Sequence, residues 1–154
     1  MSVAFRRESD EEHLEPKFEI PIPVGPNLVT ARGWALVREK VAAFEALVPT
    51  LAEGPSRDSA KRDLRYWRTR QATAQLAPRP GGATVEFGCT VICRLNGKER
   101  TLTLVGDDEA DPAAGLIAFS APLARAMMQA ERDDLVPYGG NPDAIEILAI
   151  SVNP

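Results

Sequence analysis

The stretch VGDDEADPAAGLIAFSAPLARAMM (residues 105–128) decides the fold of the C-terminal half of the chain. Its acidic run, residues 107–115, is rich in turn-forming residues and predicts a loop. The apolar run LIAFS (116–120) predicts a short strand. The sequence that follows, APLARAMMQA (121–130), predicts a short helix, because Pro122 suits the first turn of a helix.

The flanking sequence predicts a sheet around these elements. VEFGCTVICRL (85–95) and ERTLTLV (99–105) read as strands, and the Asn-Gly pair between them (96–97) is the strongest short-range indication of a β-hairpin. Two further strands are predicted at 133–138 and 144–152. We therefore expect a small, mostly antiparallel sheet wrapped on one short helix.

Residues 30–77 have a different periodicity, in which apolar residues recur every three or four positions and so predict two helices. Thr30 suits the N-cap of the first helix, and Ser56 or Asp58 could start the second. Two short heptad stretches predict an antiparallel coiled-coil hairpin, a rod roughly 30 Å long. The two expected apolar stripes are Trp34, Val37, Val41, Phe44 and Val48, and Ala60, Leu64, Trp67, Gln71 and Ala74.

Charge divides the chain along similar lines. Residues 1–29 carry a net charge of −3, residues 30–77 one of +4 and residues 78–154 one of −5. We predict a flexible, acidic and proline-rich arm (1–29), the helical hairpin (30–77) and an α+β arrangement completed by the β domain (83–154). An alternative for the arm is docking as an edge strand, because four apolar residues alternate at period two: Phe18, Ile20, Ile22 and Val24.

Composition excludes several classes of function. A net charge of −4 over 154 residues argues against a general nucleic-acid coat. No apolar run is long enough to cross a membrane, and the N-terminus lacks a signal peptide, so we expect a cytoplasmic protein without membrane contact. Cys89 and Cys93 lie four apart on one predicted strand, too far for a disulfide, and read as buried free thiols. His13 is the sole histidine, so neither a metal site nor a Cys–His nucleophile is predicted.

Two charged segments invite a functional interpretation. Asp108–Asp111 spells the DEAD box of helicases, but no phosphate-binding loop accompanies it, and a solvated turn is the simpler interpretation. The second helix carries a basic face, which composition favours as a solvated surface with local ion pairs. It could also present a positive rod to an acidic or nucleic-acid-lined surface. The residues of this face are Arg57, Lys61, Arg62, Arg65 and Arg68.

The order and spacing of these elements resemble a known family. A hairpin opening at Thr30 to Gly33, the run at 105–128 and the terminal strand EILAI (146–150) resemble the Gre-type transcription elongation factors over residues 27–152. The resemblance implies an FKBP-like C-terminal domain that docks at the rim of the secondary channel of bacterial RNA polymerase, while the hairpin enters the channel. The polymerase contacts that it implies are Ser120, Ala121, Pro122, Leu123 and Arg125.

The sequence departs from the family pattern in three places. Cleavage-promoting members carry two acidic residues at the hairpin tip that help hold a catalytic magnesium of the polymerase. Here the tip reads TLAEGPSRDSAKRD (50–63), in which Glu53 and Asp58 are the nearest acidic residues, and the rod is shorter. Ala121 replaces a serine before the proline, and Asp133 replaces a glycine, which predicts a turn without positive φ.

Three functions follow from this comparison. The first is a monomeric regulator that binds RNA polymerase, meets nucleic acid only within the transcription complex, has no cofactor and is not itself an enzyme, and does not stimulate transcript cleavage efficiently. The second is a true cleavage factor that uses Glu53 or Asp58. The third, from a different class, is a prolyl isomerase, for which the domain offers Phe87, Phe119 and Tyr138 as aromatic side chains.

Overall fold

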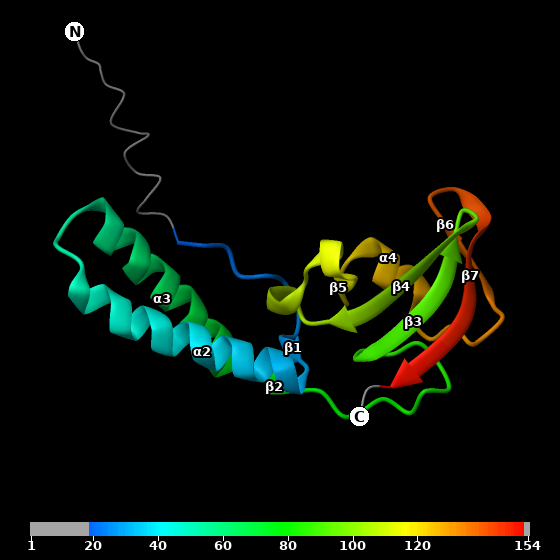
Figure 1. Ribbon diagram of the computed structural model, residues 1–154, viewed down its shortest axis with the longest axis horizontal. Helices are drawn as coiled ribbons and strands as arrows, with labels where there is room; N and C mark the ends of the chain where they lie inside the picture. The colour runs from blue at the N-terminus through cyan, green and yellow to red at the C-terminus, as the bar shows by residue number, and fades with distance from the viewer. Residues whose placement is uncertain (1–18, 153–154) are drawn as a thin grey trace, which may run out of the picture. The chain divides into compact units, whose positions relative to one another are not determined.

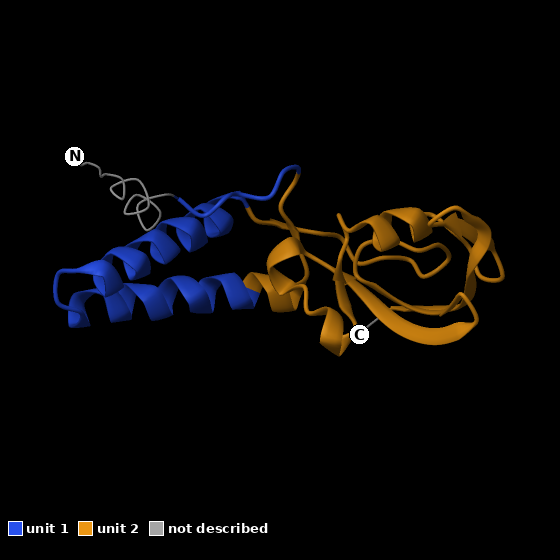
Figure 2. Ribbon diagram, turned by 90° about the horizontal axis from the view of Figure 1, so that it is seen from above, with its two compact units in different colours: residues 1–25, 35–73 blue, residues 26–34, 74–154 orange. Residues whose placement is uncertain are grey.

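The protein has an α+β fold. The computed structural model describes residues 19–152, and the chain divides into two compact units (Figures 1 and 2). The helical unit comprises residues 1–25 and 35–73, and the sheet unit comprises residues 26–34 and 74–154. The three segments expected from the sequence remain a prediction. The boundaries of the two compact units differ from the boundaries of those segments.

The helical unit is built on two helices that lie side by side and run in opposite directions (Figure 1). They are α2 (Ala31–Leu47), whose first turn belongs to the sheet unit, and α3 (Pro55–Thr73). A 3-10 turn at Val48–Thr50 ends α2. Both predicted apolar stripes supply the packing, with four residues buried: Val37, Val41, Ala60 and Leu64.

The ends of the helices are set by local chemistry. The predicted cap is confirmed, because Thr30 Oγ1 accepts the Gly33 N–H at 3.0 Å. Helix α3 begins at Pro55, slightly before the predicted Ser56 or Asp58, because proline is well suited to the first helical position. Trp34 was expected on the buried stripe but is 40% exposed.

The sheet unit contains a mixed five-stranded sheet in the order β5-β4-β3-β7-β6. The β4–β5 pair is parallel and the other pairs are antiparallel, so the expectation of a mostly antiparallel sheet is confirmed. A two-stranded parallel pair, β1-β2, completes the unit. The elements are β1 (Leu28–Val29), β2 (Gln75–Leu76), β3 (Cys89–Leu95), β4 (Lys98–Val105), β5 (Leu116–Ala118), α4 (Pro122–Met127), β6 (Leu135–Tyr138) and β7 (Asn141–Val152).

Residues with positive φ explain where these elements turn or stop. Asn96 and Gly97, at φ 50° and 84°, form the predicted two-residue hairpin turn between β3 and β4. Strand β3 is shorter than predicted, because Gly88 adopts φ 90° and interrupts the extended backbone before Cys89. Helix α4 also stops early, because Gln129 adopts φ 68° and its N–H donates to the Val85 carbonyl.

The predicted turn at Asp133 is wrong in its backbone geometry. Asp133 keeps a positive φ of 74° although it is not a glycine. Its N–H donates to the Ile147 carbonyl at 2.7 Å, and the Ile147 N–H donates to the Asp134 carbonyl at 3.0 Å. These two bonds hold the turn against β7, and aspartate is among the few residues that tolerate the left-handed region.

The core of the sheet unit lies between the sheet and α4. Cys89 and Cys93 have no exposed surface and form no disulfide, which confirms the prediction of buried free thiols. Burial raises the pKa of both thiols above its usual value, so they are protonated at neutral pH. The other fully or nearly fully buried members include Val85, Val91, Leu102, Leu104, Met127, Ile145 and Ile147.

The predicted arm ends in ordered structure. Leu28–Val29 forms β1, and Asn27 and Val29 are buried. The edge strand expected from the period-two pattern is not formed over its described part, residues 19–24, where Pro21 and Pro23 lack the N–H that pairing needs. Phe18 lies outside the described residues. Within the described range, no helix has the length and apolar character needed to cross a membrane.

Candidate functional site

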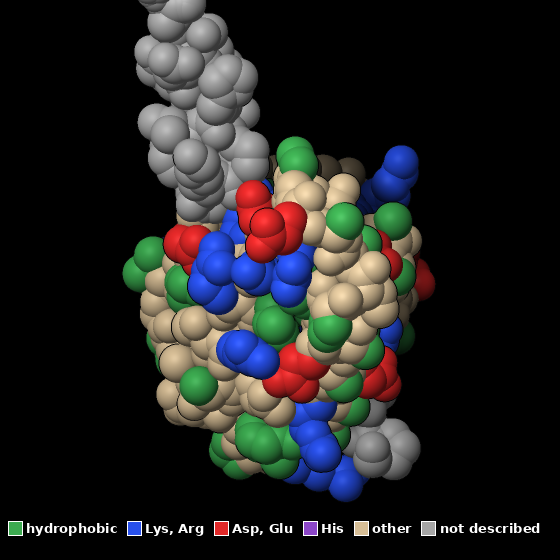
Figure 3. Space-filling model, turned by 90° about the vertical axis from the view of Figure 1, so that its left-hand side faces the viewer, with side chains coloured by type: hydrophobic (Ala, Val, Ile, Leu, Met, Phe, Trp, Pro, Cys, Tyr) green, Lys and Arg blue, Asp and Glu red, His purple; other side chains and the backbone are tan. Residues whose placement is uncertain are grey.

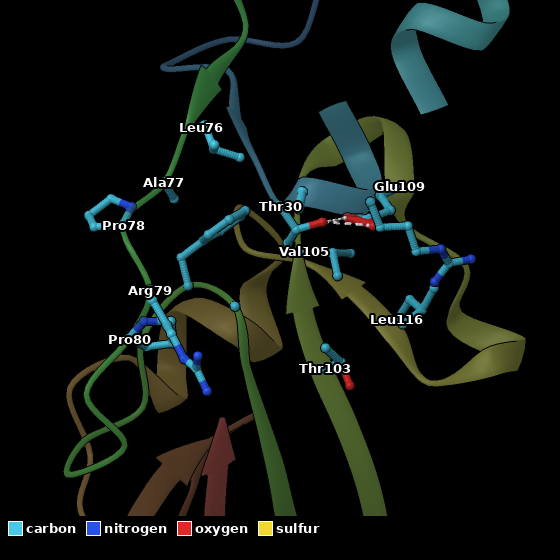
Figure 4. Close-up of a pocket in the computed structure, with 14 residues that line it drawn as sticks. Thr30, Leu76, Ala77, Pro78, Arg79, Pro80, Thr103, Val105, Glu109 and Leu116 are labelled. Atoms are coloured by element: carbon cyan, nitrogen blue, oxygen red, sulfur yellow. Dashed lines mark hydrogen bonds between the residues drawn. The ribbon is translucent and has the colours of Figure 1, made fainter. Parts of the chain in front are cut away.

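The acidic loop 107–115 is anchored to the start of α2 within the sheet unit. The loop forms two 3-10 turns, Asp107–Glu109 and Pro112–Ala114. Glu109 is only 7% exposed, and its two carboxylate oxygens accept the Thr30 hydroxyl at 2.7 and 2.9 Å (Figure 4). The interpretation of this loop as a purely solvated turn is therefore wrong at Glu109, which is buried because the loop folds back over residues 30–33.

Two glycines allow this close approach. A Cβ at Gly33 would lie 3.2 Å from Glu109 Oε1. A Cβ at Gly106 would lie 2.4 Å from the Leu28 carbonyl oxygen, closer than real side chains come. The first turn of α2, strand β1 and the acidic loop therefore meet at one corner of the sheet unit. A residue larger than glycine at position 33 or 106 would crowd this corner.

A groove opens beside this corner, entirely within the sheet unit, with a volume of about 550 Å³ (Figure 4). Most of its lining is apolar, and Arg32 and Arg79 are exposed on it. The aromatic residues of the prolyl isomerase hypothesis do not gather here. Phe87 lines the groove, whereas Phe119 and Tyr138 do not; Phe119 instead packs edge-on against Phe87, with ring centroids 5.2 Å apart.

The expected polymerase-contact segment lies at the start of α4. The Ser120 hydroxyl donates to the Asp107 carboxylate, which ties this segment to the acidic loop. Pro122 and Arg125 are exposed, so they can meet a partner. Ala121 is the N-cap residue and is half-buried, whereas Leu123 packs against the core and therefore has a structural role.

The basic face of α3 is partly neutralised by acidic side chains of the helical unit. Arg65 forms an ion pair with Glu19 at 2.7 Å, and Arg68 forms one with Glu45 at 2.9 Å. Figure 3 shows basic and acidic side chains interspersed on the end of the molecule that faces the viewer. Lys61 is exposed, whereas Arg57 and Arg62 are half-buried. Both ion pairs join α3 to acidic residues that are distant in the sequence, so they are not the local pairs expected along the helix.

The tip acids lie at the connection between α2 and α3. Glu53 and Asp58 are both exposed; Asp58 lies in the first turn of α3, where its N–H donates to the Gly54 carbonyl at 3.0 Å. Across residues 19–152, no three His, Cys, Asp or Glu side chains are grouped so that they could hold a metal ion. Within the helical unit, both tip acids thus lie at the end where α2 and α3 are connected.

The sheet unit is similar in sequence to known proteins. Residues 80–152 match the family described as "Transcription elongation factor, GreA/GreB, C-term". This region is similar to the C-terminal domain of the GreA/GreB factors. It includes the acidic loop, β5, α4 and β7, and is called the Gre domain below.

Curated relatives agree with this assignment over the same length. Transcription elongation factor GreA of Agrobacterium fabrum is 40% identical over 73 residues, covering 45% of this chain and 46% of that protein. GreA of Thioalkalivibrio sulfidiphilus is 43% identical over 74 residues, again covering 45% and 46%. The chain thus matches a little under half the length of these relatives.

Solved structures of related proteins match a longer stretch at lower similarity. GreA/GreB from Nitrosomonas europaea is 21% identical, with a TM-score of 0.38 over 83% of this chain and 99% of that one. Gfh1 of Thermus thermophilus is 12% identical, with a TM-score of 0.37 over 82% and 99%. Scores this low support no argument about the arrangement of the whole chain.

Sequence reasoning missed the residues that hold the acidic loop. Thr30 was recognised as a cap, but its partner Glu109 lies 79 positions away, and no local pattern connects the two. Arg70, a further base of α3, is 1% exposed, so it is not part of an accessible face. The close glycines, Gly33 and Gly106, were the available signal that backbone segments approach one another here.

Proposed function

We propose that this protein binds bacterial RNA polymerase through its Gre domain and regulates transcription elongation, without efficiently stimulating transcript cleavage. The observation that supports this most directly is the match of residues 80–152 to the GreA/GreB C-terminal domain. In this proposal the protein acts as a monomer in the cytoplasm and holds no cofactor of its own; the catalytic magnesium belongs to the polymerase.

In the proposed complex, the start of α4 contacts the rim of the secondary channel. Pro122 and Arg125 are exposed there, and the Ser120–Asp107 hydrogen bond orders the residues before them. The FKBP-like character of the domain and the entry of the hairpin into the channel are carried over from the family resemblance, whereas the coiled-coil hairpin itself is predicted from the heptad periodicity of residues 30–77. Nucleic acid would be met only inside the transcription complex.

The proposal of weak cleavage activity rests on the tip. Glu53 and Asp58 are separated by Gly54-Pro55, whose backbone turns the chain into α3. Metal-assisted catalysis tolerates little displacement of a carboxylate, because a misplacement of about 1 Å can cost roughly a hundredfold in rate. Two acidic residues at altered spacing are therefore a poor substitute for the pair used by cleavage factors.

The decisive experiment is transcript cleavage by stalled, backtracked polymerase. The protein is added alone and, separately, together with a cleavage-competent Gre factor. We expect no shortened RNA with the protein alone, and slower cleavage when it competes with the active factor. Shortened RNA with the protein alone would instead support the cleavage-factor alternative, in which Glu53→Ala/Asp58→Ala removes cleavage and spares binding.

A matched pair of variants tests the docking site. Arg125→Glu reverses an exposed charge at the proposed contact, whereas Arg132→Glu reverses an exposed charge elsewhere in the Gre domain. We expect Arg125→Glu to weaken polymerase binding at least tenfold and Arg132→Glu to leave it within about twofold, because a lost interfacial charge pair costs 2 kcal/mol or more. Equal binding by both variants would show that α4 is not the contact.

A further inference from the structure

The groove of the sheet unit, with its volume of about 550 Å³, takes no part in the docking proposed for α4 (Figure 4). None of the residues 120–125 lines it. Its volume falls within the range of about 300–1,000 Å³ that is usual for small-molecule sites in proteins. The lining comes from four stretches that are separate in the sequence, namely 30–32, 76–80, 87–88 and 103–116.

One wall of the groove is a proline-rich segment, LAPRP (76–80), that has little conformational freedom. Its two prolines have a fixed φ, and each restricts the residue before it to extended backbone. At one end of the segment, the Ala77 N–H donates to the Val29 carbonyl at 3.1 Å. At the other end, Pro80 packs beside Gly88, where a Cβ would lie 3.5 Å from the proline ring. Because this wall is formed in advance, a ligand pays little to order it.

Apolar side chains form most of the remaining lining. Val105 and Leu116, from the neighbouring strands β4 and β5, lie on the opposite side of the groove from the proline-rich segment (Figure 4). Phe87 adds an aromatic ring, which Phe119 supports edge-on with ring centroids 5.2 Å apart. An aromatic ring among aliphatic side chains favours a ligand with a flat apolar body.

The two side-chain hydroxyls of the lining already have partners. The Thr30 hydroxyl donates to the Glu109 carboxylate at 2.7 Å, and the Thr103 hydroxyl is paired with that of Thr90 at 2.9 Å. The hydroxyls of the groove thus offer little to a neutral polar ligand.

Two guanidinium groups give the groove an excess of positive charge. Arg32, in the first turn of α2, and Arg79, on the proline-rich wall, are exposed. Within residues 19–152, neither side chain forms an ion pair or a hydrogen bond. Glu109 is the one acidic residue among the described lining residues. Its charge is offset by the Thr30 hydroxyl and by the N-terminus of α2, against which it lies.

We propose that this groove binds a small amphipathic organic anion, with a flat aromatic body and one carboxylate. The body lies against Phe87, Val105 and Leu116, and the carboxylate is held by Arg32 and Arg79. Guanidinium groups suit this role because their donors match the two oxygens of a carboxylate. The inference goes beyond polymerase binding and does not depend on it.

Nuclear magnetic resonance of the isotope-labelled full chain tests the site. The protein is titrated with naphthoate, which has a flat apolar body and a carboxylate, and separately with naphthamide, a neutral analogue of similar shape. We expect naphthoate to shift the amide signals of groove residues such as Leu76, Gly88 and Val105. Each exposed charge pair contributes up to about fivefold in affinity, so naphthoate should bind about tenfold more tightly than naphthamide.

Matched variants test the role of charge. Arg32→Gln/Arg79→Gln removes both guanidinium groups of the groove and should abolish the preference for naphthoate. Arg100→Gln/Arg132→Gln removes the same net charge from exposed positions of the sheet unit outside the groove, and should keep the preference. Leu76→Gln changes an apolar side chain of the lining that is 58% exposed, and should weaken the binding of both probes to a similar degree.

Any of three results would overturn the proposal: naphthoate leaves the groove amides unshifted, naphthamide binds as tightly as naphthoate, or Arg32→Gln/Arg79→Gln leaves naphthoate binding unchanged. A shift of the same amides with protein concentration alone would mean that a second copy of the chain occupies the groove, and would also overturn it. Polymerase is absent from these measurements, so their failure leaves docking through α4 to its own test.

Discussion

At the scale of single residues, Thr30 links two distant parts of the sequence. Its hydroxyl accepts the Gly33 N–H that begins α2 and donates to the Glu109 carboxylate of the acidic loop. A hydroxyl can do both because it has one hydrogen to donate and lone pairs to accept. Since Glu109 is nearly buried, removal of Thr30 would leave a desolvated carboxylate without this partner.

The cost of breaking this link can be predicted. Thr30→Val removes both hydrogen bonds and should destabilise the protein by about 2–3 kcal/mol, from the lost cap and the unsatisfied carboxylate. Thr30→Ser keeps the hydroxyl and should cost less than about 1 kcal/mol. Denaturant unfolding gives both values.

If Glu109→Leu is added to Thr30→Val, part of the lost free energy of unfolding should be recovered, because no buried polar group is then left unpaired. Simply additive losses would contradict the proposed role.

Asp133 gives a second prediction at this scale. Its φ of 74° is unfavourable for residues with a Cβ and most unfavourable for β-branched ones. We expect Asp133→Val to be less stable than Asp133→Gly by about 2 kcal/mol, which for a protein of this size is a difference of several degrees in Tm. Thermal unfolding followed by circular dichroism measures it, and equal midpoints would mean that the turn relaxes to negative φ.

At the scale of elements, the sequence predicts whether a segment is a helix or a strand better than it predicts where that segment begins and ends. The hairpin at 96–97 and the cap at Thr30 follow from local chemistry and are confirmed. The start of β3 and the end of α4 are misplaced, because Gly88 and Gln129 take positive φ under bonds made to Leu104 and Val85, which are distant in sequence. Local patterns therefore give the element, and tertiary hydrogen bonds decide where it stops.

The pairing of β1 with the rest of its unit depends on one glycine. A Cβ at Gly106 would lie 2.4 Å from the Leu28 carbonyl oxygen, and a backbone atom cannot move aside as a flexible side chain can. We expect Gly106→Ala to cost about 2–4 kcal/mol. Hydrogen exchange should show faster exchange of the Gln75 and Ala77 amides, which donate to Asn27 and Val29.

The matched control for this substitution is Gly81→Ala. A Cβ at Gly81 has no atom within 4 Å, so the same chemical change should leave stability and exchange almost unchanged. If Gly106→Ala resembles Gly81→Ala in both stability and hydrogen exchange, the β1–β2 pair does not need its close contact with the loop that follows β4.

At the scale of the whole molecule, charge and periodicity predict three consecutive segments, whereas each of the two compact units combines stretches that are separate in the sequence. The sheet unit takes residues 26–34 from the N-terminal side of the hairpin as well as residues 74–154. Residues 26–34 belong to the sheet unit because the Thr30–Glu109 contact and the β1–β2 pair join them to residues far apart in sequence. The functional candidates divide likewise: the docking segment lies in the sheet unit, and the basic face in the helical unit.

The division predicts which shortened chain keeps its fold. Replacing residues 35–73 with a flexible Gly/Ser linker retains β1, Thr30 and β2, and so retains the contacts of Glu109 and Gly106. A fragment starting at residue 83 loses all of these and exposes Glu109 and the side of Val105 that lines the groove.

We expect the first protein to unfold cooperatively near the midpoint of the full chain's sheet unit. The fragment should unfold at least 2–3 kcal/mol more easily, about the cost of the lost hydrogen bonds and apolar contacts. Heteronuclear NMR spectra and thermal midpoints compare the two, and a fragment 83–154 as stable as the linked protein would show that residues 26–34 add nothing to the Gre domain.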